Sequence, residues 1–137
     1  MPTLSNVTIG TTLGERTHKP STVSLFLYNA AIWNSHRIHF DQTYTTQVEQ
    51  HRGIVVDGPL QGDWLSQVAT EWLGNDGRLL QFEYSNRRAA YLGETLRAGG
   101  KVVKVNECDQ TVTIELYLKN ANDEIIAPGQ AIVQLKD

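Results

Sequence analysis

One long apolar helix is the feature that most limits how this chain can fold. Between Leu60 and Leu73, apolar side chains recur at helical spacing and cover most of the circumference, so this helix should be largely buried. Pro59 suits its first turn, and the run 74–77 (Gly-Asn-Asp-Gly) is typical of a helix end. The apolar positions, which include two core tryptophans, are Leu60, Trp64, Leu65, Val68, Ala69, Trp72 and Leu73.

The segments after this helix alternate between apolar and polar residues, which predicts β-strands. In the first of them, Leu80, Phe82 and Tyr84 should share one face, and in the last a bulge is expected at Pro128–Gly129. One buried helix and about four antiparallel strands predict an α+β architecture in a single domain spanning 1–137, with a curved sheet wrapped around the helix. The expected strands are 78–88, 93–105, 111–119 and 125–135.

The first 52 residues are less regular. Residues 7–21 predict one irregular strand that Pro20 closes. Ser21-Thr22 offers an N-cap to a short helix over 23–32, although a buried strand is an alternative for this aromatic-rich run. Asp41 should cap another short helix. The apolar residues of 23–32 that fall at helical spacing are Val23, Phe26, Leu27, Ala30 and Ala31.

Charge and cysteine content exclude several classes of protein. The net charge is −3 and the basic residues are scattered, so we expect no nucleic-acid partner. The N-terminus has no signal-peptide pattern and no apolar run approaches the ~20 residues of a membrane span, which predicts a cytoplasmic protein without a membrane partner. Cys108 is the single cysteine, and its turn-like surroundings predict an inert thiol.

Two short segments contain most of the groups that can carry chemistry. The segment 33–41 (Trp-Asn-Ser-His-Arg-Ile-His-Phe-Asp) holds two histidines, an amide and a carboxylate. The segment 53–60 (Gly-Ile-Val-Val-Asp-Gly-Pro-Leu) opens the long helix, where free backbone N–H groups and the positive helix end stabilise an anion. His36 and His39 lack an evident third ligand, so neither a metal nor another cofactor is expected.

Together these segments resemble the MaoC-like acyl-CoA dehydratases and hydratases, which have the hot-dog fold. Within that family the run Asn-x-His-Arg-Ile-His is similar to the subgroup that contains mesaconyl-, itaconyl- and methylfumaryl-CoA hydratases. The resemblance implies a homodimer or higher homo-oligomer that adds or removes water across the double bond of a short-chain enoyl-CoA thioester. Branched and dicarboxylic acyl groups are both included in that expectation.

The resemblance also implies roles for individual residues. His39 matches the catalytic histidine and Asn34 the family asparagine, while Gly58 matches the glycine whose N–H binds the thioester oxygen. Val56 and Asp57 belong to the same substrate-binding segment. The family's catalytic Asp falls on Ile32, which cannot transfer protons.

Because Ile32 cannot perform the role of the family Asp, three alternatives are open. Either His36 or Asp57 takes the place of the family Asp, or the chain is a non-catalytic acyl-thioester-binding subunit. A thioesterase on the same fold would need a carboxylate in the long helix, for which Asp63 and Glu71 are the candidates. Four cations are candidates for CoA phosphates or for plain solvent-facing charges: Arg87, Arg88, Lys101 and Lys104.

Overall fold

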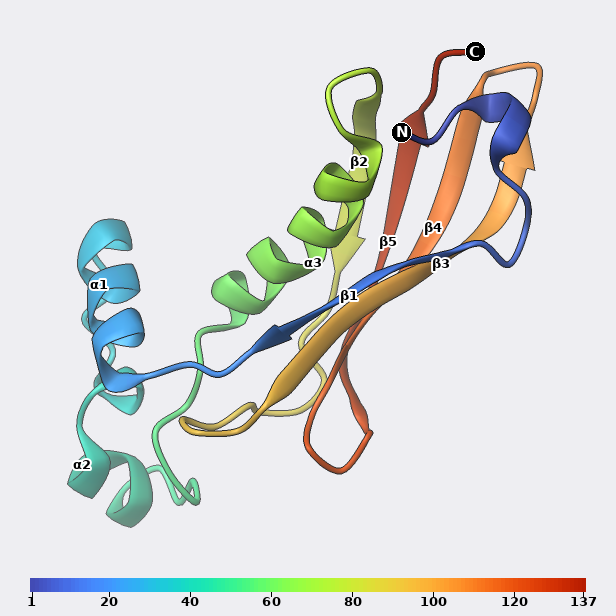
Figure 1. Ribbon diagram of the computed structural model, residues 1–137. Helices are drawn as coiled ribbons and strands as arrows, with labels where there is room; N and C mark the ends of the chain where they lie inside the picture. Colours follow the sequence, from blue (N-terminus) through green and yellow to red (C-terminus); the bar gives the residue numbers. More distant parts are fainter.

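The computed structural model describes all 137 residues, and one antiparallel sheet curls around the helix α3 (Figure 1). The strand order is β1-β3-β4-β5-β2, so β1 and β2 are the edge strands. The helices α1 and α2 stand beside one end of the sheet, next to the start of α3. The elements are β1 (Thr12–His18), α1 (Thr22–Ile32), α2 (Gln42–Gln47), α3 (Gly58–Leu73), β2 (Arg78–Tyr84), β3 (Leu96–Asn106), β4 (Thr111–Lys119) and β5 (Ile125–Gln134).

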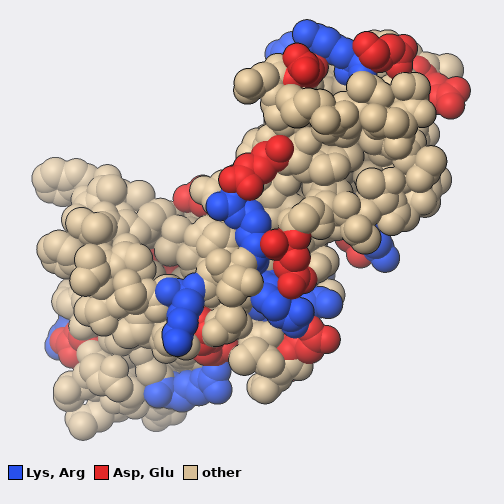
Figure 2. All heavy atoms as spheres, in the orientation of Figure 1, with Lys and Arg blue, Asp and Glu red and all other residues tan.

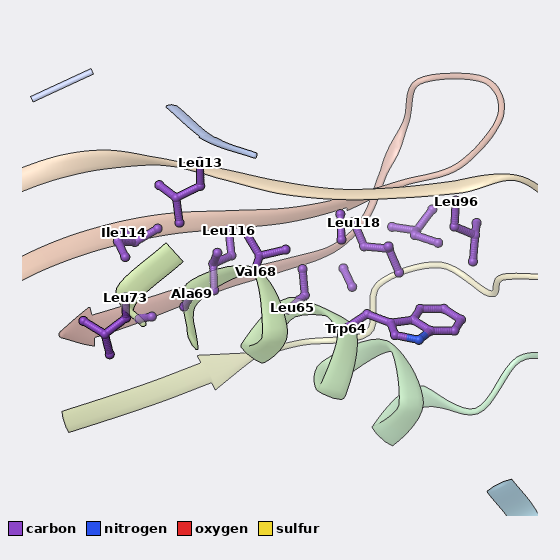
Figure 3. Packing of buried hydrophobic residues seen from close by; sticks show 14 of the residues in the cluster. Leu13, Trp64, Leu65, Val68, Ala69, Leu73, Leu96, Ile114, Leu116 and Leu118 are labelled. Atoms are coloured by element: carbon purple, nitrogen blue, oxygen red, sulfur yellow. The ribbon is translucent and has the colours of Figure 1, made fainter. Parts of the chain in front are cut away.

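The core lies between α3 and the concave face of the sheet (Figure 3). Leu65 of α3 is fully buried, and Leu116 and Leu118 of β4 belong to the same cluster. Each such leucine removed from water contributes roughly 1.5–3 kcal/mol to stability. Trp64 is buried and Trp72 packs against the cluster from its edge, as the apolar pattern predicts. The predicted α+β architecture is confirmed, and no helix is long and apolar enough to cross a membrane.

Helix α1 forms where it was predicted, but it buries a different face. The Ser21 hydroxyl accepts a hydrogen bond from the Ser24 N–H at 3.1 Å, and Trp33 ends the helix in the left-handed region with φ 58°. Only Leu25 and Asn29 are buried along α1. The apolar stripe that contains Phe26 instead faces outward, because α1 stands beside the sheet rather than on it.

Two strands end earlier than the alternation indicates. The irregular strand expected over 7–21 is confined to β1 and shifts register between Leu13 and Arg16. β2 ends at Tyr84 and shifts register against β5 between Leu79 and Gln81. The prediction that Leu80 shares a face with Phe82 and Tyr84 is wrong, because this shift turns Leu80 outward and Leu79 toward the core.

The bulge predicted at Pro128–Gly129 is also wrong. Pro128 pairs in register with Tyr117, and the irregularity of the β4–β5 pairing lies earlier, between Leu118 and Lys119. The Pro128 carbonyl accepts the Ser85 N–H, so this residue directs its backbone groups toward β2 just where β2 has ended. The ladder therefore loses no hydrogen bond to the proline, and no bulge is needed.

Candidate active site

The site is centred on a buried carboxylate at the start of α3. Asp57 occupies the N-cap position, where an aspartate usually accepts a hydrogen bond from the first turn. Its side chain makes no such bond and is completely shielded from solvent, at 0% exposure. Because a buried charge requires partners, the residues that Asp57 contacts instead define the site.

Two asparagine amides hold this carboxylate. The Asn29 side chain of α1 donates to Asp57 Oδ1 at 2.9 Å, and the Asn34 side chain donates to Oδ2 at 3.3 Å. The same Asn29 nitrogen also donates to the Leu25 carbonyl at 2.8 Å, so two acceptors fix the orientation of this amide. Asp57 is therefore held in place from one side by α1 and its following loop.

His39 faces the same carboxylate from the short 3-10 turn Arg37–His39. Its Nδ1 lies 2.7 Å from the Val55 carbonyl, which can only accept, so Nδ1 carries a proton. Its Nε2 lies 3.4 Å from Asp57 Oδ2. An imidazole and a carboxylate that face each other are groups of the kind that general acid–base chemistry uses.

A backbone N–H without an acceptor directly follows Asp57 in the chain. Gly58 is the first residue of α3, and its N–H has no acceptor within the chain, as expected in a first helical turn. A side chain at Gly58 would meet the amide of Asn86, an exposed side chain that would have to move aside. Gly58 lines a cavity of about 230 Å³ that Arg87 and Arg88 also line.

Val56 and His36 make hydrogen bonds with other groups and do not contact Asp57 through them. The Val56 N–H donates to the Ala90 carbonyl at 2.8 Å, and the Val56 carbonyl accepts from Gln61, so its backbone is occupied. His36 is exposed, and its Nδ1 accepts the Ile38 N–H at 3.3 Å. Its ring centroid lies 6.0 Å from that of His39, and the structure shows no contact between His36 and Asp57.

The remaining candidates lie outside this centre. Ile32 is 45% exposed at the end of α1. Asp63 is exposed on α3, and Glu71 forms an ion pair with Arg16 at the side of α3 that faces β1. Arg88 pairs with Glu124 at 2.5 Å. Arg87, which with Arg88 lines the Gly58 cavity, is exposed, and so are Lys101 and Lys104.

Asp41 caps α2, as its position predicts, and this gives a testable pH dependence. Its carboxylate accepts the Tyr44 N–H at 3.0 Å and pairs with Arg37 at 2.8 Å. The Tyr44 bond first, and then Arg37, hold the pKa of Asp41 below its ordinary value. The resulting stabilisation is complete above the ordinary pKa and is lost as pH falls through the lowered pKa.

We expect Asp41→Asn, which keeps the cap, to reduce the steepness with which the unfolding free energy falls below about pH 4. Chemical denaturation at a series of pH values measures this, and an unchanged slope would contradict it.

Asn29 is the site residue that the sequence pattern did not single out. It lies among apolar residues in α1, and a lone amide in such a helix is the only local signal it offers. Its partner Asp57 is 28 positions away in the chain. Asn29 Oδ1 is buried without a hydrogen-bond partner, which an interior amide rarely tolerates without another benefit.

The curled sheet around α3 places the chain in the hot-dog class, as solved structures confirm. An (R)-hydratase from A. caviae involved in PHA biosynthesis is similar with a TM-score of 0.85 over 95% of this chain and 98% of that chain, at 15% identity. A MaoC-like dehydratase reaches a TM-score of 0.90 over 98% of this chain and 42% of that chain, at 17% identity. Likeness at such low identity establishes the fold.

Sequence comparison assigns the family. The family model for hydroxyacyl-thioester dehydratase type 2 matches residues 7–92, and the chain belongs to this family. Mesaconyl-C(4)-CoA hydratase from Chloroflexus aurantiacus is 41% identical over 54 residues. This match covers 39% of the present chain and 19% of that relative, so the chain spans only about a fifth of the relative's length. The predicted membership of the MaoC-like dehydratases is thereby confirmed.

Proposed function

We propose that this protein adds water to, or removes it from, the double bond of an enoyl-CoA thioester. The observation that carries the proposal is Asp57, a buried carboxylate that turns away from its helix cap toward His39. A purely structural aspartate at this position would cap α3. The family membership of the chain supports the same reaction class.

The proposed reaction uses His39 to exchange one proton, with the buried Asp57 facing its ring. In hydration, His39 Nε2 takes a proton from water while the water oxygen bonds to the β-carbon of the thioester, and Asp57 balances the charge of the imidazolium that forms. The double-bond electrons move toward the carbonyl, and His39 returns the proton to the α-carbon. The Gly58 N–H stabilises the thioester oxygen as it gains charge, an effect typically of ~3 kcal/mol. The atoms balance without any cofactor.

In this proposal Asp57 replaces the carboxylate that the family carries at the position of Ile32. The amide of Asn34, two residues after Ile32, donates to Asp57 and so links the position of the missing carboxylate to its proposed replacement. This arrangement favours an enzyme over a non-catalytic binding subunit. It also favours a hydratase over a thioesterase, because Glu71 is engaged with Arg16 and Asp63 is exposed.

We also propose that the protein acts as a homodimer or a higher homo-oligomer. The edge strands β1 and β2 present backbone groups that a second copy can pair. Sedimentation equilibrium should then give at least twice the chain mass of 15.3 kDa. A mass of one chain at micromolar concentration would contradict this part of the proposal.

Replacing His39 by alanine should lower the rate of hydration by about 10²–10⁴-fold, the usual contribution of a positioned acid or base. The measurement is the loss of enoyl-thioester absorbance with crotonyl-CoA, with a thiol reagent in parallel to detect free CoA. His36→Ala is the matched control and should change the rate less than about threefold, because His36 does not contact Asp57.

If free CoA is released at the same rate as the absorbance is lost, the protein is a thioesterase and not a hydratase. Binding of crotonyl-CoA without any turnover would establish a non-catalytic subunit instead.

A further inference from the structure

The loop that follows β2 lies beside the segment that leads into α3. The Val56 N–H donates to the Ala90 carbonyl at 2.8 Å, and the Leu92 N–H donates to the Ile54 carbonyl at 2.9 Å. An isolated antiparallel bridge joins the two segments between these bonds. This pairing brings the loop to the point where α3 begins.

Asn86 lies in this loop, and its backbone is fixed on both sides. The Ser85 N–H donates to the Pro128 carbonyl at 3.0 Å, and the Arg87 N–H donates to the Ile126 carbonyl at 2.9 Å. The side chain of Asn86 is exposed and forms no hydrogen bond within the chain. Asn86 therefore has a defined position and an amide that is free to bind a ligand.

The amide of Asn86 reaches Gly58. Its Nδ2 lies so close to the point where a Gly58 Cβ would be that such a Cβ would displace it. Both residues line the cavity of about 230 Å³ described above. Because Cα–Cβ bonds and backbone N–H groups both tilt toward the N-terminus of a helix, the Asn86 nitrogen lies at the same end of α3 as the free Gly58 N–H.

A further polar group of this cavity lacks a partner. Gln61 lines the cavity and is 2% exposed, and its Oε1 is buried without a hydrogen-bond partner. Its Nε2 donates to the Val56 carbonyl at 3.3 Å, which fixes the end of the amide that is the acceptor. Buried acceptors without partners are uncommon, so this cavity is suited to a polar ligand rather than to an apolar one.

The cavity also adjoins the proposed acid–base pair. Val55 lines it, and the Val55 carbonyl lies 2.7 Å from His39 Nδ1. Asp57 directly precedes Gly58 in the chain. The short segment 55–58 thus connects the free donors to both residues of the pair.

The cations around the cavity are less suited to hold a thioester oxygen. Arg88 is engaged with Glu124. On the face shown in Figure 2, most Lys and Arg side chains likewise lie beside acidic ones. Arg87 lines the cavity but is exposed, and solvent screens the charge of such a side chain.

We infer that the Asn86 amide is a second hydrogen-bond donor to the thioester oxygen, beside the Gly58 N–H. The inference rests on the proposed hydratase function and adds a catalytic residue to its site. Amide side chains such as Asn act together with backbone N–H groups in sites of this kind. Both donors stabilise the charge that the oxygen gains as water adds to the β-carbon, so they lower the barrier rather than only bind the substrate.

The first experiment measures hydration of crotonyl-CoA by Asn86→Ala in the intact chain. The variant should lose about 10²-fold in kcat, the lower end of the usual effect of one such donor, because Asn86 is exposed. KM should change less than about threefold, because the donor acts mainly in the transition state. Asn75→Ala makes the same change at an exposed asparagine beyond the other end of α3, so this control should match the wild type.

The second experiment separates contact with the thioester from a structural role of Asn86. The absorption band of 2,4-hexadienoyl-CoA moves to longer wavelength when donors polarise its thioester carbonyl. The probe should show this shift when bound to His39→Ala, which turns it over slowly, and adding Asn86→Ala should reduce the shift by about half. Thermal melts should place Asn86→Ala within about 2 °C of the wild type, since exposed substitutions cost little stability.

Three results would overturn the inference. A kcat for Asn86→Ala within about threefold of the wild type would refute it and leave the proposed hydratase intact. A loss of kcat with an unchanged band shift would assign a structural role to Asn86. A band shift that Arg87→Ala abolishes and Asn86→Ala preserves would assign the contact to Arg87.

Failure of the proposed function has a different signature. If the wild type binds crotonyl-CoA without hydrating it, the hydratase is refuted. The band shift needs no turnover, so its size in Asn86→Ala still decides whether Asn86 contacts the thioester oxygen.

Discussion

Asp57→Asn should lower the kcat for enoyl-thioester hydration by about 10²–10⁴-fold, with a much smaller change in KM. Asparagine preserves the size of the side chain but has no charge to balance the imidazolium that His39 forms in the proposed reaction. The loss corresponds to ~3–5 kcal/mol of transition-state stabilisation. Steady-state kinetics with crotonyl-CoA measure it.

The two amides that hold Asp57 add a structural consequence. Asparagine has one acceptor oxygen, so either Asn29 or Asn34 must lose its partner, which costs about 1–3 kcal/mol in stability. Thermal melts of the variant separate this effect from the loss of kcat. Asp63→Asn, an equivalent change on the exposed face of the same helix, is the control and should alter neither quantity.

A double variant tests whether the two residues act as one unit. If Asp57 acts through His39, His39→Ala combined with Asp57→Asn should lose little more activity than the worse single variant. If the factors by which the two single variants lower kcat multiply in the double variant, the two residues have independent roles. A kcat for Asp57→Asn within threefold of the wild type would assign Asp57 a structural role and reopen the question of how Ile32 is compensated.

Leu65→Ala should be the most destabilising of the substitutions considered. Leu65 is fully buried between α3 and the sheet, next to Leu116 and Leu118 (Figure 3). Removing its side chain forfeits the transfer free energy and leaves a cavity, which together cost about 3 kcal/mol within a range of 2–5. For a chain of this size the melting temperature should fall by roughly 10 °C.

Leu80→Ala is the matched control for this change. The register shift in β2 leaves Leu80 47% exposed, so its truncation should lower the unfolding free energy by less than about 1 kcal/mol. Urea denaturation of both variants compares the two leucines directly. A large effect at Leu80 would restore the face that simple alternation predicts, with Leu80, Phe82 and Tyr84 together.

Local patterns were sufficient for most of the elements. The period of 3.6 residues and the flanking Pro59 and Gly74 predict α3, and the period of two predicts β4 over the residues where it forms. Ser21 and Asp41 cap their helices as their positions indicate. These features depend on neighbours within a few residues, so the local sequence is sufficient to predict them.

Tertiary packing decided the features that depend on distant partners. The α1 stripe was expected at helical spacing, yet only the position of α1 beside the sheet shows that Leu25 and Asn29 are the buried side. A one-residue shift against β5 exchanges Leu79 and Leu80, because strand faces alternate with period two. Pro128 needs no bulge because β2 ends beside it.

In the candidate site, too, some features follow from local sequence and others depend on distant partners. The sequence predicts two segments that contain acid–base groups, with His39 in one and Asp57 and Gly58 in the other, because their spacing resembles a family pattern. That Asp57 leaves its cap and that Asn29 and Asn34 hold it opposite His39 depends on tertiary packing. A buried carboxylate takes the donors that packing brings to it, and these donors come from chain positions 23 and 28 residues away.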